Sequence, residues 1–236
     1  ASIIKEQDRS SGKKNVHVAV MPCTAKKYEA QRDEFQLDGT PNVDYVITTQ
    51  ELIQMIKESG IVFDELEPEA VDMPLGMITG AGVIFGVTGG VTEAVLRRIL
   101  PDKSPTALKL IAFEGIRGME GIKEASILCG EKNVKIAIVS GLRNAGDLIE
   151  RLKAGEHYDF VEVMACPGGC ISGAGQPFAN VDVKEERGKK LYSADKLCNI
   201  KRSEDNPLIA TLYNGLLKGR TEELLHVHYM KNHRDN

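Results

Sequence analysis

Residues 75–90 constrain the fold more strongly than any other stretch of this 236-residue sequence, because six of these sixteen residues are glycine. Each glycine inside a helix costs about 1 kcal/mol relative to alanine, so the stretch is not an ordinary helix interior. We expect a loop whose backbone approaches its neighbours closely, followed by a helix over residues 91–100 that stops at Pro101.

Apolar runs of strand length alternate with segments of helical composition along the rest of the chain. Strands are predicted at residues 16–20, 45–47, 108–113 and 160–163, with a hairpin formed by residues 126–128 and 135–139. Helices are predicted at residues 24–34, from an N-cap at Thr49 to a stop at Gly60, and at residues 144–153. This alternation predicts an α/β fold with a mostly parallel sheet flanked by helices. The polar residues 2–14 carry no helix-cap signal, and the charged tail from residue 183 predicts one or two helices.

Composition excludes several classes of protein. The net charge of −4 and the pI near 5.8, with scattered Lys and Arg, argue against a dedicated nucleic-acid binder. No apolar run approaches the roughly 18 residues that span a bilayer, and the start does not resemble a signal peptide. Five cysteines are too few for a disulfide scaffold and are better interpreted as metal ligands or reactive thiols. We therefore expect a reduced, cytoplasmic protein.

The segment M-A-C-P-G-G-C-I-S-G-A-G-Q-P, residues 164–177, carries the strongest chemical signal. Cys166 and Cys170 are separated by one proline and two glycines. Two buried cysteines in a tight turn are the plain structural interpretation, and a zinc site would need a second cysteine pair. Iron–sulfur ligation fits better, because cluster cysteines come from loops that wrap closely around the cluster. Glycines also let backbone N–H groups approach its sulfides.

A second cysteine motif is M-P-C-T-A-K-K-Y-E, residues 21–29. Cys23 follows a predicted strand, as Cys166 does, and ligands of α/β proteins bind beyond the carboxyl ends of strands. We therefore expect Cys23, Cys166 and Phe85 to converge on one edge of the sheet. Lys26 and Glu29 follow at helical spacing and are compatible with an ordinary surface ion pair. A methionine precedes each cysteine by two residues, and methionine is a conformable wall residue for a dry metal site.

Both motifs resemble the cysteine motifs of the [FeFe]-hydrogenases. Residues 22–29 are similar to the family's P-C-x-x-K-x-x-E, and residues 162–176 to its E-x-M-A-C-x-x-G-C-x-x-G-x-G-Q. The glycine loop at residues 84–95 and the segments L-Y-S-A-D, N-P-L-I and L-H-V-H-Y also resemble the family. The resemblance runs from about Ser2 to Tyr229. It implies the second lobe of a two-lobed hydrogenase catalytic domain, with a large-subunit-like lobe at residues 1–182 and a small-subunit-like helical segment at residues 183–236.

The resemblance also implies a six-iron cofactor, the H-cluster. In this centre a [4Fe–4S] cubane is joined through a cysteine sulfur to a diiron subcluster with carbonyl, cyanide and bridging dithiolate ligands. It assigns Cys23, Cys166 and Cys170 as cubane ligands, with Cys170 as the bridge. Lys26 would donate a hydrogen bond to a cyanide. Met21, Met164 and Phe85 would wall the diiron unit. The implied reaction is reversible reduction of protons to H2, with electrons from ferredoxin or a similar carrier.

One departure from the family pattern limits these implications. The family's T-S-C-C-P motif supplies a fourth cubane cysteine and a proton-relay cysteine, and this sequence has no adjacent cysteines. We expect a missing amino-terminal half, or another chain, to complete the cleft. A hydrogen-sensing relative and an iron–sulfur assembly relative without a diiron unit remain alternatives. Cys129 and Cys198 fall in no metal spacing and are interpreted as structural or partly exposed thiols.

Overall fold

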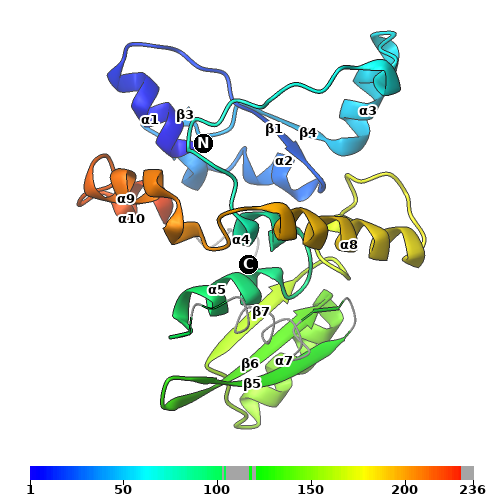
Figure 1. Cartoon of the computed structure of the whole chain (residues 1–236), viewed down its shortest axis with the longest axis vertical. Coiled ribbons are helices and arrows are strands. Elements are labelled where there is room, and N and C mark those ends of the chain that lie inside the picture. Colours follow the sequence, from blue (N-terminus) through cyan, green and yellow to red (C-terminus); the bar gives the residue numbers. More distant parts are fainter. Residues whose placement is uncertain (103, 105–116, 119–120, 230–236) are drawn as a thin grey trace, which may run out of the picture. The chain divides into compact units, whose positions relative to one another are not determined.

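The structure of this protein is a computed structural model that describes residues 1–102, 104, 117–118 and 121–229 (Figure 1). The strand predicted at residues 108–113 lies outside these described residues. Contacts divide the chain into two compact units. Unit 1 comprises Ala1–Val71, Ala174–Pro177 and Leu208–Asn236, and unit 2 comprises Asp72–Gly173 and Phe178–Pro207. In the described part of the chain, no helix combines the length and apolar character needed to cross a membrane.

Unit 1 is built on a short parallel sheet. β1 (Val18–Met21) pairs with β4 (Tyr45–Thr48), and Met21 lies opposite Thr48 in the register. A helix follows each strand: α2 (Ala25–Glu29) after β1 and α3 (Thr49–Glu58) after β4. Between them lie the 3-10 turn η1 (Asp33–Phe35) and a two-residue antiparallel pair, β2 (Gln36–Leu37) and β3 (Thr40–Pro41). The 3-10 turn η2 (Phe63–Glu65) follows α3.

The start of α3 corrects the predicted cap. Thr48, rather than Thr49, is the N-cap, because its hydroxyl accepts a hydrogen bond from the Glu51 N–H at 3.2 Å. The Glu51 carboxylate in turn accepts from the Thr48 N–H at 2.7 Å, which completes a capping box. An ion pair with Lys27 and these cap bonds lower the pKa of Glu51 to about 2. The stop at Gly60 is confirmed, since α3 ends at Glu58 and Gly60 has a positive φ of 69°.

One further helix prediction in unit 1 needs correction, and one helix of unit 1 was not predicted. The helix predicted over residues 24–34 ends at Glu29. The polar start of the chain forms α1 (Ser2–Ser10), which contacts α10 (Thr221–Leu225). The Ser2 hydroxyl donates to the Leu224 carbonyl at 2.7 Å, and Arg220 pairs with the buried Glu6 at 2.7 Å. These partners are more than 200 positions away in the sequence, so a local pattern does not predict α1.

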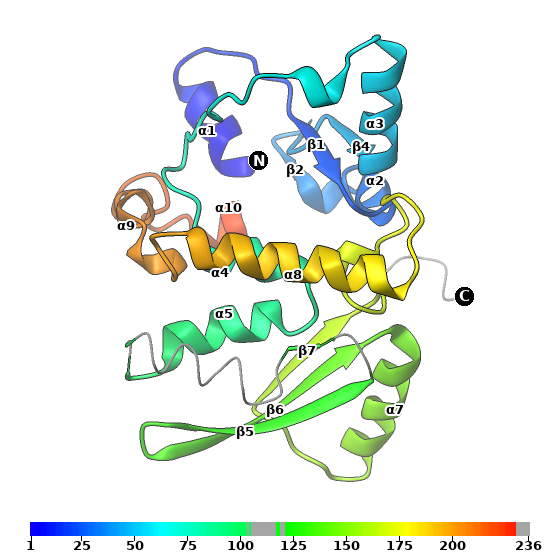
Figure 2. The same ribbon diagram turned by 45° about the vertical axis from the view of Figure 1, so that its right-hand side comes forward.

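The described residues of unit 2 form a three-stranded sheet in the order β5–β6–β7 (Figure 2). β5 (Ile122–Cys129) and β6 (Lys132–Ser140) form the predicted hairpin, and β7 (Phe160–Met164) pairs parallel with β6 after α7 (Leu142–Lys153). Alternate residues of β6 point to opposite faces. Ile136 and Ile138 pack with Leu96 of α5 (Gly90–Ile99), while Ala137 and Val139 pack with Leu148 of α7. The sheet therefore lies between two helices.

The glycine-rich stretch contains the predicted close approaches and two short helical turns, α4 (Gly80–Val83) and η3 (Ile84–Gly86). A Cβ atom on Gly90 would lie 1.8 Å from the Ile84 carbonyl oxygen, so the chain can turn into α5 here only with glycine. The predicted stop of α5 before Pro101 is confirmed.

The carboxyl-terminal quarter of the chain contains α8 (Val181–Leu197), η6 (Ser203–Asp205), α9 (Pro207–Asn214) and α10. α8 contacts α4 and η3 within unit 2. A buried Arg97 on α5 joins Glu93 at 2.7 Å to Asp195 of α8 at 2.7 Å. The boundary proposed between residues 182 and 183 does not coincide with the division into compact units and stays a prediction.

The α/β class is confirmed. Among the described residues, the strands are distributed over three small sheets with two parallel and two antiparallel pairs, where the sequence indicated one mostly parallel sheet. Consequently the strands that lead to Cys23 and Cys166 belong to different sheets. β1 pairs with β4, whereas β7 extends a hairpin, so the described strands do not form the single sheet edge that was predicted.

Candidate metal centre

Cys23 lies two residues beyond the carboxyl end of β1 in unit 1, as predicted. The segment Ala174–Pro177 packs directly on this strand end. The Gly175 N–H donates to the Pro22 carbonyl at 2.9 Å, and its own carbonyl accepts from the Gln50 N–H at 3.0 Å. A Cβ atom on Gly175 would lie 3.0 Å from the Cys23 nitrogen and 2.9 Å from Thr48. Only a glycine lets the backbone approach Cys23 this closely.

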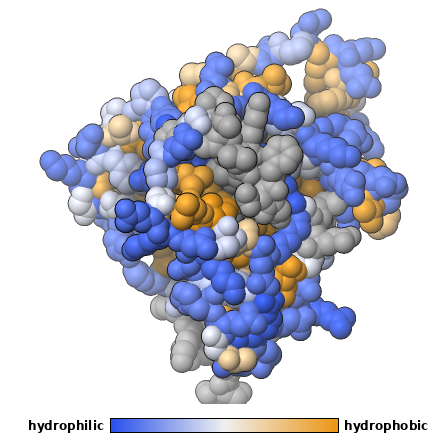
Figure 3. All heavy atoms as spheres, turned by 60° about the horizontal axis from the view of Figure 1, so that its bottom comes forward, coloured by the Kyte–Doolittle hydropathy of each residue, from blue (hydrophilic) through white to orange (hydrophobic). Residues whose placement is uncertain are grey.

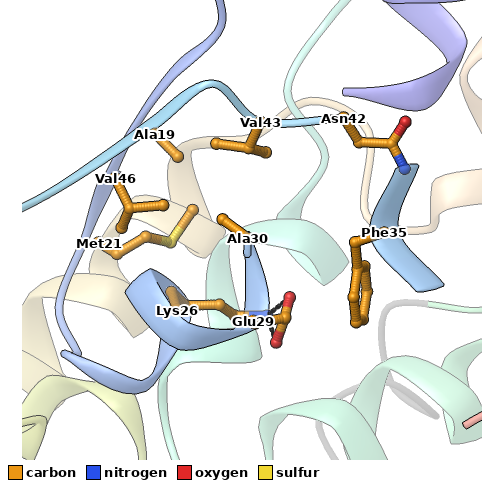
Figure 4. Close-up of a pocket in the computed structure, with 9 residues that line it drawn as sticks. All are labelled: Ala19, Met21, Lys26, Glu29, Ala30, Phe35, Asn42, Val43 and Val46. Carbon is orange, nitrogen blue, oxygen red and sulfur yellow. Dashed lines mark hydrogen bonds and ion pairs between the residues drawn. The ribbon is translucent and has the colours of Figure 1, made fainter. Parts of the chain in front are cut away.

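Lys26 and Met21 line a pocket of unit 1 whose other walls are mainly apolar (Figure 4). The Lys26 ammonium pairs with both carboxylate oxygens of Glu29, at 2.7 and 2.8 Å. This is the surface ion pair that the spacing indicated. An ammonium has three N–H groups, so the pair leaves donor capacity for another acceptor. The Lys26 side chain is 45% exposed and can reach a ligand at the surface of the pocket.

The Cys166–Cys170 loop begins two residues beyond β7 in unit 2. Gly168 and Gly169 have positive φ angles of 89° and 90°, a conformation that side-chain-bearing residues rarely adopt. The Gly168 N–H donates to the Ser140 hydroxyl at 2.9 Å, and the Gly169 N–H to the Cys166 carbonyl at 2.9 Å. The loop then enters the 3-10 turn η5 (Cys170–Ser172). Two glycines therefore set the path between the two cysteines.

The residue 84–90 loop packs against the cysteine loop. The Thr88 N–H donates to the Gly168 carbonyl at 3.3 Å. A Cβ atom on Gly169 would lie 2.9 Å from both the Gly86 carbonyl oxygen and the Thr88 nitrogen. Phe85 comes from the same loop and is 47% exposed, while Met164 is half-buried. The structure thus brings Phe85's loop to the Cys166–Cys170 loop, as the motifs predicted.

Glu162 is a buried residue of β7, and it connects the strand that leads to Cys166 with the residues where the 84–90 loop meets α5. Its side chain is buried, at 5% exposure, and accepts hydrogen bonds at the start of α5. One oxygen accepts from the Gly89 N–H at 2.6 Å, and the other from the Thr92 N–H and hydroxyl, both at 2.7 Å. Glu162 is the first residue of the E-x-M-A-C motif and was not predicted to be a site residue. The signal in the sequence is an acidic residue between two valines of an otherwise apolar strand, which is unusual enough to predict a specific role.

The donor set fits an iron–sulfur cofactor. All five cysteines are described, and none forms a disulfide. Cys23 is half-buried in unit 1, and in unit 2 Cys166 is half-buried and Cys170 is exposed. Within neither unit do three or more described His, Cys, Asp or Glu side chains gather into a metal-binding set. The glycine backbone beside Cys166 and Cys170 is the kind of close cradle that cluster-binding loops require.

Comparison with known proteins identifies the family. Residues 1–174 match the family model for the iron only hydrogenase large subunit, C-terminal domain, and residues 181–232 match that for the iron hydrogenase small subunit. The chain therefore belongs to the iron-only hydrogenase family, and the resemblance noted from the cysteine motifs is confirmed. Membership indicates a protein that binds an iron–sulfur cofactor.

Two relatives and one solved structure show the range of this family. The NADP-reducing hydrogenase subunit HndD of Solidesulfovibrio fructosivorans is 46% identical over 227 residues, which cover 94% of this chain and 39% of that protein. Cytosolic iron-sulfur assembly component 3 of Mus musculus is 32% identical over 223 residues, covering 90% of this chain and 47% of that protein. The [FeFe]-hydrogenase HydA1 from Chlamydomonas reinhardtii has a TM-score of 0.72 and 35% identity, covering 95% of this chain and 66% of that chain. The chain thus spans less than half the length of these two curated relatives.

Proposed function

We propose that this chain is the part of an iron-only hydrogenase that carries three cubane ligands and the lysine anchor of the diiron subcluster. The observation that carries the proposal is the Cys166–Cys170 loop. This loop follows β7, contains two glycines with positive φ and packs against the residue 84–90 loop. Together these features place closely packed backbone beside the two cysteines. Cys23 is the third proposed ligand.

The covalent chain supports a centre that uses all three cysteines. Only four positions separate Cys170 from Ala174, and a fully extended chain covers at most about 3.6 Å per residue, or about 14 Å here. Ala174 begins the segment that is hydrogen-bonded beside Cys23. The chain that leaves Cys170 therefore continues directly into the segment that is hydrogen-bonded beside Cys23.

The H-cluster, when bound, supplies the redox chemistry that converts two protons and two electrons into H2. The residues of this chain bind, orient and shield it. Cys23, Cys166 and Cys170 would donate thiolate ligands, with Cys170 as the bridge to the diiron unit. Lys26 would donate a charge-assisted hydrogen bond to a cyanide, an interaction that strengthens where water is excluded. Met21, Met164 and Phe85 would provide an apolar wall.

Three cysteines leave one cubane ligand to be supplied from outside this sequence. We propose that another polypeptide segment supplies it and covers exposed apolar side chains of unit 2, including Met73, Met77, Ile78 and Phe85. Hydrophobic side chains also reach the surface on the face drawn in Figure 3. Ferredoxin or a similar carrier would deliver electrons, and the cytoplasm would keep the five cysteines reduced.

Hydrogen evolution and infrared spectra together test this function. The protein, completed by the segment that supplies the fourth ligand and loaded anaerobically with both parts of the H-cluster, is supplied with reduced methyl viologen. We expect H2 in the gas phase and the infrared bands of carbonyl and cyanide ligands. Intact bands without appreciable H2 would identify a hydrogen-sensing relative instead of the enzyme.

A second candidate function is iron–sulfur cluster assembly without a diiron unit. The 32% identity to cytosolic iron-sulfur assembly component 3 favours it. Such a protein would contain the cubane and lack carbonyl and cyanide bands after the same loading, and it would produce no H2. The retention of Lys26, Met21 and Met164 supports the hydrogenase, because a cubane alone gives these side chains no ligand to contact.

A further inference from the structure

Glu162 is a buried carboxylate whose hydrogen bonds join two segments of the proposed centre. It lies on β7, two residues before Met164 and four before Cys166. Its three donors come from Gly89 and Thr92, at the junction of the residue 84–90 loop and α5. Both oxygens accept, one from a backbone N–H group and the other from a backbone N–H group and a hydroxyl. The two backbone N–H groups can only donate, so the site is built for a side chain that accepts on both oxygens.

Capping α5 alone would not require a buried carboxylate from a distant strand. Serine, threonine, aspartate and asparagine are the preferred N-cap residues, whereas the N-cap of α5 is Gly89 and has no side chain. The cap comes instead from a strand 70 positions later in the sequence. Burying a carboxylate costs free energy that its hydrogen bonds must offset. The contact therefore fixes β7 relative to the glycine loop at the point where both lead into the candidate centre.

The backbone carries this constraint to Cys166. Beyond Met164 the loop returns to the same glycine segment, where the Thr88 N–H donates to the Gly168 carbonyl and Gly169 packs on Gly86. Glu162 and Gly168 thus attach β7 and the Cys166–Cys170 loop to neighbouring residues of the glycine segment. A shift of Gly89 relative to β7 would move Thr88, and with it the support of the Cys166–Cys170 loop.

We propose that Glu162 is a positioning residue for Cys166 and Met164, and that its charge lowers the reduction potential of the bound cubane. The second part of this proposal, the effect on the reduction potential, rests on the proposed function. Reduction adds negative charge to a cluster, and a nearby buried carboxylate opposes that addition. The first part concerns the geometry of the cysteine loop and applies to the metal-free protein as well.

Glu162→Gln tests the proposal, because glutamine keeps the size of the side chain and removes its charge. A glutamine oxygen can accept on one side only, so its NH2 group faces the N–H of either Gly89 or Thr92. The control is Asp195→Asn, which alters another buried carboxylate of unit 2, bonded to Arg97 farther along α5. Both substitutions are expected to lower thermal stability.

Two readouts separate positioning from general destabilisation. In the metal-free protein, we expect Glu162→Gln to raise the native-state alkylation rate of Cys166 about tenfold, the effect of one lost charge-assisted hydrogen bond. Asp195→Asn should leave that rate within about twofold of the wild type. In the loaded protein, Glu162→Gln should shift the cubane potential to more positive values in an EPR-monitored titration. Equal alkylation rates in the two variants would overturn the positioning role of Glu162. An unchanged cubane potential in Glu162→Gln would overturn the effect of its charge. Failure to load any cluster would count against the proposed function and leave the alkylation result decisive for positioning.

Discussion

Lys26→Ala is expected to leave a folded protein that binds its cubane and loses its diiron unit. The pair that Lys26 makes with Glu29 is an exposed i,i+3 contact, and such contacts contribute roughly 0.2–0.5 kcal/mol to folding. The proposed cyanide contact has a larger role, because Cys170 would be the diiron unit's one covalent attachment. Losing one oriented charged donor at a reaction centre typically costs about 100-fold or more in rate. We expect weak or absent carbonyl and cyanide bands and a similar fall in hydrogen evolution.

Lys27→Ala is the matched control for this prediction. Lys27 is the next residue of α2, is 40% exposed and pairs with Glu51 at 2.6 Å. Its loss removes the same charge from the same helix without touching the pocket that contains Met21 and Lys26. Infrared bands and hydrogen evolution should then match the wild type. Unchanged bands in Lys26→Ala would show that Lys26 forms only its surface ion pair with Glu29 and does not contact the diiron unit.

Gly169→Ala is expected to disrupt the cysteine loop of unit 2. Its φ of 90° is unfavourable for alanine, and the new Cβ atom would meet the Gly86 oxygen and Thr88 nitrogen at 2.9 Å. Backbone strain of this kind costs about 1–3 kcal/mol, before the backbone contacts are relieved. We expect a clear fall in melting temperature together with reduced iron content, measured by thermal unfolding and iron analysis.

Gly146→Ala separates this effect from a general glycine effect. Gly146 lies inside α7, and a Cβ atom there would meet nothing within 4 Å. Replacing a helical glycine by alanine typically stabilises a protein by roughly 0.5–1 kcal/mol. The control should therefore unfold at the same or a higher temperature and bind the same amount of iron. If Gly169→Ala behaves like this control, the loop is not as closely packed as the structure indicates.

The cysteine loops were the most predictable features, because their chemistry is encoded locally. A strand, a cysteine and glycines in sequence were enough to place Cys23 and Cys166 just beyond β1 and β7. The hairpin and α5 were predictable for the same reason, since turn residues and Pro101 mark their ends. The family resemblance added the roles of Lys26, Met21, Met164 and Phe85, which stay predictions.

The features that the sequence did not reveal depend on partners far along the chain. α1 is held by Leu224 and Arg220, and α5 is capped by Glu162 rather than by a neighbouring residue. The assignment of strands to three sheets likewise depends on pairing between distant segments, which hydrophobic periodicity does not specify. Local patterns predict elements well, whereas these contacts are decided by tertiary packing.

The most direct test of the central claim is the iron content and EPR spectrum of five single Cys→Ser variants in the loaded protein. We predict that Cys23→Ser, Cys166→Ser and Cys170→Ser each lose most of the cubane signal, because each removes a proposed ligand. Cys129→Ser and Cys198→Ser should retain the iron content and spectrum of the wild type. A Cys23→Ser protein with a full, unaltered cubane, or a Cys129→Ser protein without one, would contradict the assignment of the three ligands.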